Sequence, residues 1–521
     1  MSTSTSPSVQ TRPLPQRALS QSDSVFVDSP VLEHPTGKPS DLSYLIISGG
    51  TGANSIAAAF GPSPAFVLPV SDDGGSSSEI LRCFGGPSIG DIRSRLIRLI
   101  TLASNPTSRD EKERAAIYHL MAYRFPAHAA EKEVRELWME IVEGQSDLWD
   151  GIGQDKKECI RAFLVHFQTL CLKRAHKRFS FRNFSLGNGF LTGARDLFGS
   201  LPSAIFLFKS IAGVNTGVQV IPVIDTNQTV TIAAQLANSS TLVGQCAISH
   251  PTPPPTPITT SPTTPLIAPA PQRTHQVPSL PSKLRNHFRR DSRTFDTPDM
   301  SLPPSVRGSP DLNGMAEEEP WAGGNLAYRK GEEETPLEAR IERVFYINLY
   351  GQEIYPEPNH EFLEALNQRD VLVYSCGSLW TSIVPCLALK GLAASIASSQ
   401  TLRARVLLLN SVNDRETPEY TASEYISSIT GMLGHYDKPK RNRGKESILP
   451  GPIWRTSDLI SHVVFLEGCG VQVDHEHILA QGVKMIGVPP SVHGAKEGAT
   501  PMFSNEAVEW AMEKVMGDLH I

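Results

Sequence analysis

Two carboxylates, two glycines and four hydroxyls stand side by side in residues 71–78, which have the sequence Ser-Asp-Asp-Gly-Gly-Ser-Ser-Ser. The carboxylates belong to Asp72 and Asp73. Carboxylate oxygens suit a Mg²⁺ ion, which prefers oxygen ligands, and a carboxylate is also able to accept the proton of a hydroxyl group. We therefore predict Asp72 and Asp73 as catalytic residues and as ligands of a magnesium ion.

A glycine-rich turn, Ser48-Gly49-Gly50-Thr51-Gly52, precedes this acidic segment and is followed by a predicted helix over residues 53–60. Glycine lets the backbone approach a phosphate closely, and the free N–H groups at the start of a helix favour an anion. We expect the turn to hold a phosphate. An isolated turn of this kind is equally compatible with a plain connection between a strand and a helix.

Both segments follow apolar runs, residues 44–47 and 65–70, that are typical of buried strands. The carboxyl ends of neighbouring parallel strands open on the same crevice of an α/β sheet. We therefore predict that the glycine-rich turn and the acidic segment face one cleft. The acidic segment alone could be a solvated turn, but this interpretation is less favoured because the glycine-rich turn occurs in the same arrangement.

A third segment, residues 86–93, adds the carboxylate of Asp91 and the guanidinium of Arg93. We predict that this pair orients a reacting phosphate; the alternative is a helix cap and a surface ion pair. Either Ser185 or Asn188 caps a helix that begins near residue 185, or Asn188 instead faces the crevice. Residues 371–382 repeat the order of strand, glycine and hydroxyls, and they are a second candidate for an anion or ribose site.

The remaining residues predicted to contact a nucleotide or a nucleotide sugar are small or polar and follow the apolar runs. They are Gly74, Gly75, Ser76, Ser77, Gly377, Ser378, Thr381, Ser382 and Asn410. Cys376 is interpreted as a buried structural thiol, because no histidine stands near it in the sequence.

The composition excludes several classes of protein. The chain has 521 residues, 40% of them hydrophobic, and a net charge of −6, which indicates a globular protein without general affinity for nucleic acid. No apolar run reaches the ~18 residues of a membrane span. The seven scattered cysteines include no C-x-x-C pair, so neither a disulfide framework nor a zinc site is expected.

We expect a cytoplasmic location. Prolines near the N-terminus disfavour a mitochondrial import helix, whereas the basic run at 438–445 leaves a nuclear signal or an anion-binding loop as alternatives to a solvated loop. Residues 1–40 are predicted to be a disordered tail, and the proline-rich residues 250–335 a disordered insertion. The insertion is either an inert spacer or a contact for a protein partner.

Apolar strands that alternate with helices predict a parallel sheet covered on both faces, formed by residues 41–249 and 336–521. Periodic apolar residues predict a helical subdomain at about residues 104–180. Further strands are expected at 218–224, 229–234, 241–249 and from residue 341, with a helix that starts near Thr421.

The combination of SGGTG, SDDGGSSS and GDIR resembles the CofD-like superfamily. That group contains the 2-phospho-L-lactate transferases of deazaflavin cofactor synthesis and the YvcK-type gluconeogenesis factors. Residues 123–125, 185–188, 377–385 and 420–423 continue the resemblance, which covers about residues 42–249 and 338–515. The acidic segment is more similar to the second branch and the SGGTG opening to the first, and Trp380 stands where the second branch usually shows tyrosine.

The resemblance implies a Rossmann-like three-layer α/β/α domain with a nucleotide or a diphosphate in the crevice. It also implies two functions. The first is transfer of a phospho-group, with Mg²⁺, from a nucleotide-activated donor to an alcohol. The second is binding of a nucleotide sugar by a non-catalytic regulator. The partner expected in both cases is a phosphorylated small molecule or nucleotide, and a homodimer is left open.

Overall fold

The computed structural model describes residues 31–32, 42–49, 52–250, 335–348, 350–437, 454–496 and 498–519. Gly50, Thr51, most of the predicted tail, nearly all of the predicted insertion and the basic run at 438–445 lie outside these ranges. Within them, no helix is long and apolar enough to cross a bilayer.

Seven parallel strands form the main sheet, in the order β13-β12-β11-β10-β2-β3-β5. They are β2 (Tyr44–Ile47), β3 (Ala65–Leu68), β5 (Gln219–Pro222), β10 (Val371–Tyr374), β11 (Ala404–Leu408), β12 (His462–Leu466) and β13 (Lys484–Val488). β2 and β3 are direct neighbours, with Ile46 in register with Phe66. The predicted adjacency of the strands before the glycine-rich and acidic segments is confirmed.

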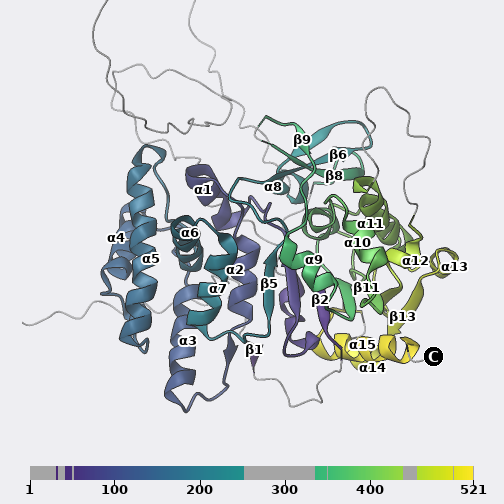
Figure 1. Cartoon of the computed structure of the whole chain (residues 1–521), viewed down its shortest axis with the longest axis horizontal. Coiled ribbons are helices and arrows are strands. Elements are labelled where there is room, and N and C mark those ends of the chain that lie inside the picture. The colour runs from purple at the N-terminus through teal and green to yellow at the C-terminus, as the bar shows by residue number, and fades with distance from the viewer. Residues whose placement is uncertain are drawn as a thin grey trace, which may run out of the picture. The chain divides into compact units, whose positions relative to one another are not determined.

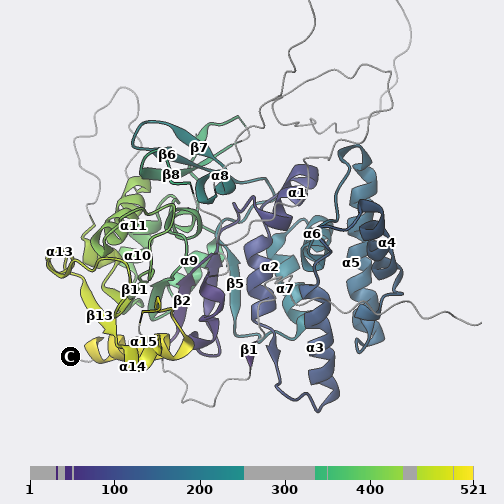
Figure 2. The same cartoon turned by 180° about the vertical axis from the view of Figure 1, so that it is seen from behind.

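Both faces of this sheet are buried, which explains why its strands are continuous apolar runs. Side chains alternate along β2: Tyr44 and Ile46 join one apolar core, and Leu45 and Ile47 join the other. The first core is closed by α15 (Asn505–Leu519) and the second by α2 (Gly90–Arg98). The predicted three-layer α/β/α arrangement is therefore confirmed (Figures 1 and 2).

The remaining helices include the two that were predicted to begin near residues 185 and 421. Beside the β5 edge lie α3 (Arg109–Ala122), α4 (Glu131–Glu143), α5 (Gln154–Lys173), α6 (Leu186–Phe198) and α7 (Leu201–Ala212) (Figure 1). The others are α1 (Gly75–Phe84), α8 (Gln245–Ser249), α9 (His360–Leu366), α10 (Leu392–Ser398), α11 (Ala422–Tyr436), α12 (Thr456–Leu459), α13 (His475–Ala480) and α14 (Pro490–His493).

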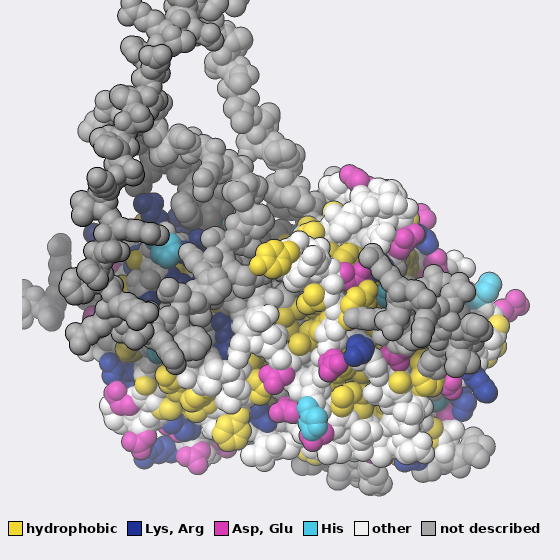
Figure 3. All heavy atoms as spheres, turned by 45° about the horizontal axis from the view of Figure 1, so that its top comes forward, with side chains coloured by type: hydrophobic (Ala, Val, Ile, Leu, Met, Phe, Trp, Pro, Cys, Tyr) yellow, Lys and Arg dark blue, Asp and Glu magenta, His cyan; other side chains and the backbone are white. Residues whose placement is uncertain are grey.

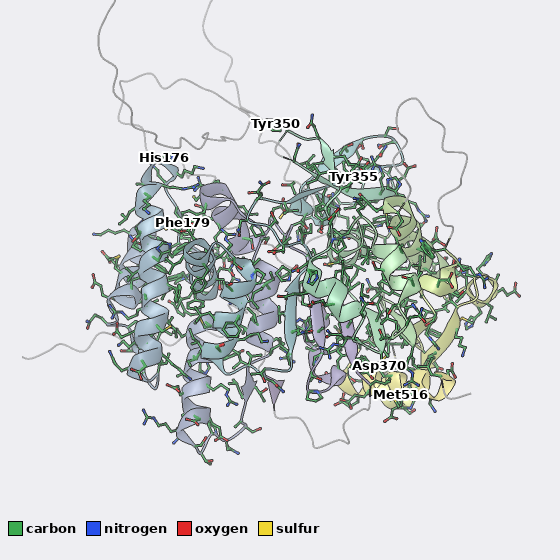
Figure 4. All side chains as sticks on the ribbon, in the orientation of Figure 1. His176, Phe179, Tyr350, Tyr355, Asp370 and Met516 are labelled. Atoms are coloured by element: carbon green, nitrogen blue, oxygen red, sulfur yellow. The ribbon has the colours of Figure 1, made fainter. Side chains whose placement is uncertain are left out.

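A separate antiparallel sheet has the strand order β7-β6-β8-β9. It consists of β7 (Thr241–Val243), β6 (Thr231–Leu236), β8 (Ile341–Ile347) and β9 (Glu353–Ile354). In Figure 4, Asp370 marks the lower edge, where β10 begins, and Tyr355 marks the small sheet at the opposite edge. The antiparallel sheet thus lies at the carboxyl ends of the parallel strands. A short parallel pair, β1 (Val31–Leu32) with β4 (Thr101–Leu102), completes the strands.

Two local predictions are wrong. Residues 241–249 form a strand only as far as Val243; Gly244, at φ 92°, ends it, and α8 follows. Residues 53–60 form two 3₁₀ turns, η1 (Gly52–Asn54) and η2 (Ala57–Phe60), in place of one α-helix. Arg95 and Arg98 of α2 donate to the carbonyl oxygens of Ala53 and Asn54, which an α-helix would use in its own ladder.

Candidate functional site

The strand order reverses at β2, which lies between β3 and β10. From β2 the chain adds β3 and β5 on one side, and later adds β10 to β13 on the other. Ligands of open α/β sheets bind outside the carboxyl ends of the strands at such a reversal. The loops after β2, β3 and β10 therefore define the candidate site.

The loops after β2 and β10 touch each other through residues that the sequence analysis selected. A Cβ atom added to Gly49 would lie only 2.8 Å from the Cβ of Ser382, and one added to Gly52 would lie 3.6 Å from the Cα of Gly377. Only glycine allows so close an approach at position 49. The structure thus brings together the two segments that were predicted separately as phosphate and anion sites.

Asn410, at the end of the neighbouring β11, fixes the second of these loops. Its Oδ1 accepts from the N–H of Gly377 at 2.9 Å, and its Nδ2 donates to the Gly377 carbonyl at 2.8 Å. Gly377 has φ 144°, a conformation that favours glycine. Asn410 therefore shapes the loop through the backbone of Gly377.

Arg95 holds the loop after β2. It was not predicted from the sequence as a site residue. It is 1% exposed, its guanidinium donates to the Oγ of Ser48 at 3.1 Å and to the Ala53 carbonyl at 3.2 Å, and it lies over the ring of Phe66. These contacts hold Ser48, the first residue of the glycine-rich turn, and Ala53, the residue that follows it. The signal available in the sequence was a second arginine in the same predicted helix, two residues after Arg93 and so on a different face of that helix.

Asp72 lies on the loop after β3, against the first turn of α2. Its Oδ1 accepts from the N–H of Gly74 at 3.0 Å, and a Cβ on Gly90 would lie 2.8 Å from its Oδ2. Burial is the largest influence on this carboxyl, and together with the nearby carboxylates Asp91 and Asp73 it raises the pKa of Asp72 to about 8. Asp72 is therefore able to exchange a proton near neutral pH.

The side chain of Asp73 contacts α8, whereas that of Asp72 lies against α2. Its Oδ1 accepts from the N–H of Cys246 in the first turn of α8 at 2.8 Å, and its Oδ2 packs against Gly244. A carboxylate at a helix start satisfies a backbone donor that the helix leaves unpaired. Asp73 therefore joins the acidic segment to the antiparallel sheet, in addition to any role toward a ligand.

The hydroxyls of Ser76, Ser77 and Ser78 are engaged inside the protein, whereas the buried Oγ of Ser71 has no hydrogen-bond partner among the described residues. Asn188 donates from Nδ2 to the Oγ of Ser76 at 2.6 Å, and its Oδ1 has no hydrogen-bond partner among the described residues. Ser77 interacts with Asp72 through its side chain. Of the two predictions for Asn188, the cap is wrong: the residue lies inside α6 and contacts the start of α1.

Asp91 and Arg93 diverge along α2. Asp91 is buried and close enough to Asp72 to raise its pKa, whereas Arg93 donates to the carbonyl of Ala122 at the end of α3 at 3.2 Å. The Cγ of Arg93 also lies 3.3 Å from the position that a Cβ on Gly187 would take. The structure therefore brings Asp91 to the acidic segment and places Arg93 against α3 and α6.

Glu416 is a second residue of the site that was not predicted from the sequence. It is 1% exposed and holds η5, the π-helix Leu379–Ile383 after β10. Its Oε2 accepts from the N–H groups of Trp380 at 2.9 Å and Thr381 at 3.1 Å, and its Oε1 accepts from the Oγ1 of Thr381. Burial, with the nearby Asp414, raises the pKa of Glu416 to about 7.

The polar groups of Thr381 are therefore occupied by a carboxylate of the protein itself. Glu416 lies in the loop after β11, six residues beyond Asn410. The local feature that could have identified it is an acidic residue in a segment between two apolar elements.

The donor set suits magnesium better than a metal that needs a cage of protein ligands. Among the described residues, no group of three or more His, Cys, Asp or Glu side chains is arranged to hold a metal ion. Mg²⁺ is usually bound by one or two carboxylates, with phosphates and waters as its other ligands. Asp72 fits that pattern, since a cation beside it would offset the mutual repulsion of the carboxylates.

Cys376 lies at the same edge, and burial raises the pKa of its thiol to about 11. Because the thiolate is the nucleophilic form, this thiol is unreactive near neutral pH.

A cavity of about 510 Å³ lies behind η5, between the start of β8 and α11, and is lined in part by Trp380, Tyr420 and Arg340. A second cavity, of about 600 Å³, lies among the helices near Arg109 and Gly153. On the face of the molecule in Figure 3, acidic, basic and hydrophobic side chains are interspersed over the described surface.

The family model described as "2-phospho-L-lactate transferase CofD" matches residues 45–486. The chain belongs to the CofD family. The match includes every part of the site built above, from the end of β2 through the acidic segment to the loop after β11.

Among curated proteins, the chain is 34% identical over 449 residues to the uncharacterised protein YNL011C of Saccharomyces cerevisiae, covering 83% of this chain and 92% of the relative. It is 35% identical over 78 residues to a gluconeogenesis factor of Halalkalibacterium halodurans, covering 15% of this chain and 24% of that protein. A solved structure of a UPF0052 family protein from Bacillus halodurans matches 90% of this chain and 99% of its own chain. The TM-score is 0.50 and the sequence identity is 17%, so the two proteins are similar in fold.

Proposed function

We propose that this CofD-family protein binds a nucleotide-activated phosphate compound where the strand order reverses, and transfers its phospho-group to an alcohol. The observation that carries this proposal is the position of Asp72. It is a partly buried carboxylate whose pKa is raised to about 8, on the loop after β3, and β3 lies beside β2, the strand that precedes the glycine-rich turn. A general base works best when its pKa lies near the working pH.

The ligand's charge is matched by groups at the same edge of the sheet. α1 and α2, of ten and nine residues, both begin beside Asp72, and the start of a helix favours an anion. Arg95 adds a cation beneath the glycine-rich turn. These groups would hold the diphosphate, while Gly49 and Gly377 let the backbone come close to it.

In the reaction, the alcohol oxygen forms a bond to phosphorus and the bond from phosphorus to the nucleoside monophosphate oxygen breaks. Asp72 accepts the proton of the alcohol. Magnesium, held by Asp72 and Asp73 with the phosphates, would neutralise charge on the transferred group. Backbone N–H groups that are already in place stabilise the charge that develops.

Calorimetry and product analysis test the proposal. The full chain, with Mg²⁺, is titrated with guanylylated phospholactate and, separately, with UDP- and GDP-sugars, and then incubated with each plus an alcohol acceptor. Release of a nucleoside monophosphate that requires the acceptor supports transfer. Binding of neither class of compound overturns the proposal.

A second function, a non-catalytic regulator that binds nucleotide sugars, is favoured by two observations. The local match to a protein named gluconeogenesis factor is one. The other is the bond from Cys246 to Asp73, which gives one of the two carboxylates a structural partner. Tight binding of a nucleotide sugar without any product would select this function.

A further inference from the structure

α8 spans the space between the two halves of the candidate site. At its start, the N–H of Cys246 donates to Asp73 of the acidic segment at 2.8 Å. At its end, the Oγ of Ser249 lies 2.6 Å from Glu416 and 3.0 Å from the Oγ1 of Thr381. A helix of five residues is thus bonded to the loop after β3 at one end and to η5 at the other.

Glu416 is the point at which these bonds converge. Four donors meet its two oxygens: the N–H groups of Trp380 and Thr381 and the hydroxyls of Thr381 and Ser249. Hydrogen bonds to a charged acceptor are stronger than neutral ones, and a buried carboxylate without them would be costly. The carboxylate therefore fixes η5 and α8 relative to each other.

η5 in turn touches the glycine-rich turn. Ser382, the residue after Thr381, is the one whose Cβ limits position 49 to glycine. A continuous series of contacts therefore runs from Asp73 through α8, Glu416 and η5 to Gly49. π-Helical turns occur frequently at functional sites.

We propose that Glu416 is a positioning residue that sets the distance between the acidic segment and the glycine-rich turn, and so the affinity for a diphosphate. The role rests on the proposed function, because it acts on the same ligand. Glu416 does so without contacting the ligand itself, through the backbone of η5 and the hydroxyl of Ser249.

The test compares Glu416→Gln with the wild-type chain by calorimetry with GDP and Mg²⁺, and by hydrogen exchange of residues 245–249 and 379–383. Glutamine retains one oxygen but presents an NH₂ group to the remaining donors. We expect GDP affinity to fall about tenfold, equivalent to about 1.4 kcal/mol, and exchange to rise in both segments. Ser249→Ala removes the hydrogen bonds of Ser249 to Glu416 and to Thr381 but leaves the other three donors to Glu416 in place, and it should lower affinity by about threefold, within the range for the loss of one or two hydrogen bonds.

Glu113→Gln is the matched control. Glu113 also accepts from a backbone N–H, that of Gly153 at 2.7 Å, but it lies in α3. We expect its GDP affinity to equal that of the wild type. Unchanged GDP affinity in Glu416→Gln overturns the positioning role, as does unchanged exchange at 379–383. A wild-type chain that binds neither GDP nor the compounds above overturns the proposed function itself.

Discussion

The backbone N–H of Cys246 donates to the Oδ1 of Asp73 at 2.8 Å, so a residue predicted for chemistry also fixes α8 to the acidic segment. Loss of the side chain and loss of its charge therefore have different consequences. Substitutions that separate the two effects distinguish a structural carboxylate from one that acts on a ligand.

Asp73→Asn should keep the fold and abolish turnover, because an amide oxygen can still accept from Cys246 but carries no charge for a metal ion. Asp73→Ala should in addition lower the free energy of unfolding by about 1 kcal/mol, because it leaves the partly buried N–H of Cys246 without its acceptor. Urea unfolding and the release of nucleoside monophosphate measure the two effects. Turnover that survives in Asp73→Asn would leave the residue with its structural role alone.

Asp72 should make the protein less stable as the pH rises. Its pKa is about 8 in the folded chain and 3.8 in its ordinary state, so between these values the folded chain binds the additional proton. Stability should therefore decline from about pH 4 to pH 8, by at most about 1.4 kcal/mol per pH unit. Asp72→Asn, measured by urea unfolding without Mg²⁺, should show a flatter profile; an unchanged slope would contradict the raised pKa.

Gly49→Ala should destabilise the chain by about 1 to 3 kcal/mol, because its methyl group would overlap Ser382. Gly431→Ala is the control: it lies within α11 with no atom within 4 Å of an added Cβ, and should stabilise by about 0.5 to 1 kcal/mol. Thermal unfolding compares the two. The double variant Gly49→Ala with Ser382→Gly should recover part of the loss, and no recovery would contradict the contact.

Arg95→Met should weaken binding of inorganic pyrophosphate about tenfold or more, since it removes both the charge and the two bonds that shape the turn. Arg405→Met is the control. The guanidinium of Arg405 likewise makes two hydrogen bonds, to the carbonyls of Leu402 and Ile396, but it lies near the start of β11. Calorimetry on folded protein measures both variants, and equal affinities in the two would exclude a role for Arg95 at the site.

The sequence predicted the central strands β2, β3 and β10 most clearly, because each is buried on both faces and therefore apolar throughout. The reversal at β2 places Gly49 beside Ser382, more than 300 residues apart in the sequence, and both were selected from local patterns alone. Glu416 and Arg95 were missed because their significance depends on what they contact. Nothing local reveals that one carboxylate meets four donors or that one guanidinium spans a turn.

Contacts between residues far apart in the sequence also explain the two wrong predictions, at α8 and at η1. Thr241 to Val243 have strand-forming residues, and only the bond to Asp73, from another part of the chain, shows why a helix follows. The turns after Gly52 are set by Arg95 and Arg98 of α2. Long-range partners determined these conformations against the local preference.

Arg415 donates to the carbonyls of Ala247 and Ile248 and, through Nε, to that of Thr335. One guanidinium thus ties together the points where the chain leaves the core and returns to it. Because both ends are anchored to the same side chain, the number of residues between them can change in evolution at little cost to the core, since closure entropy grows slowly with length. Related chains are then free to carry very different lengths at this position while keeping the same candidate site.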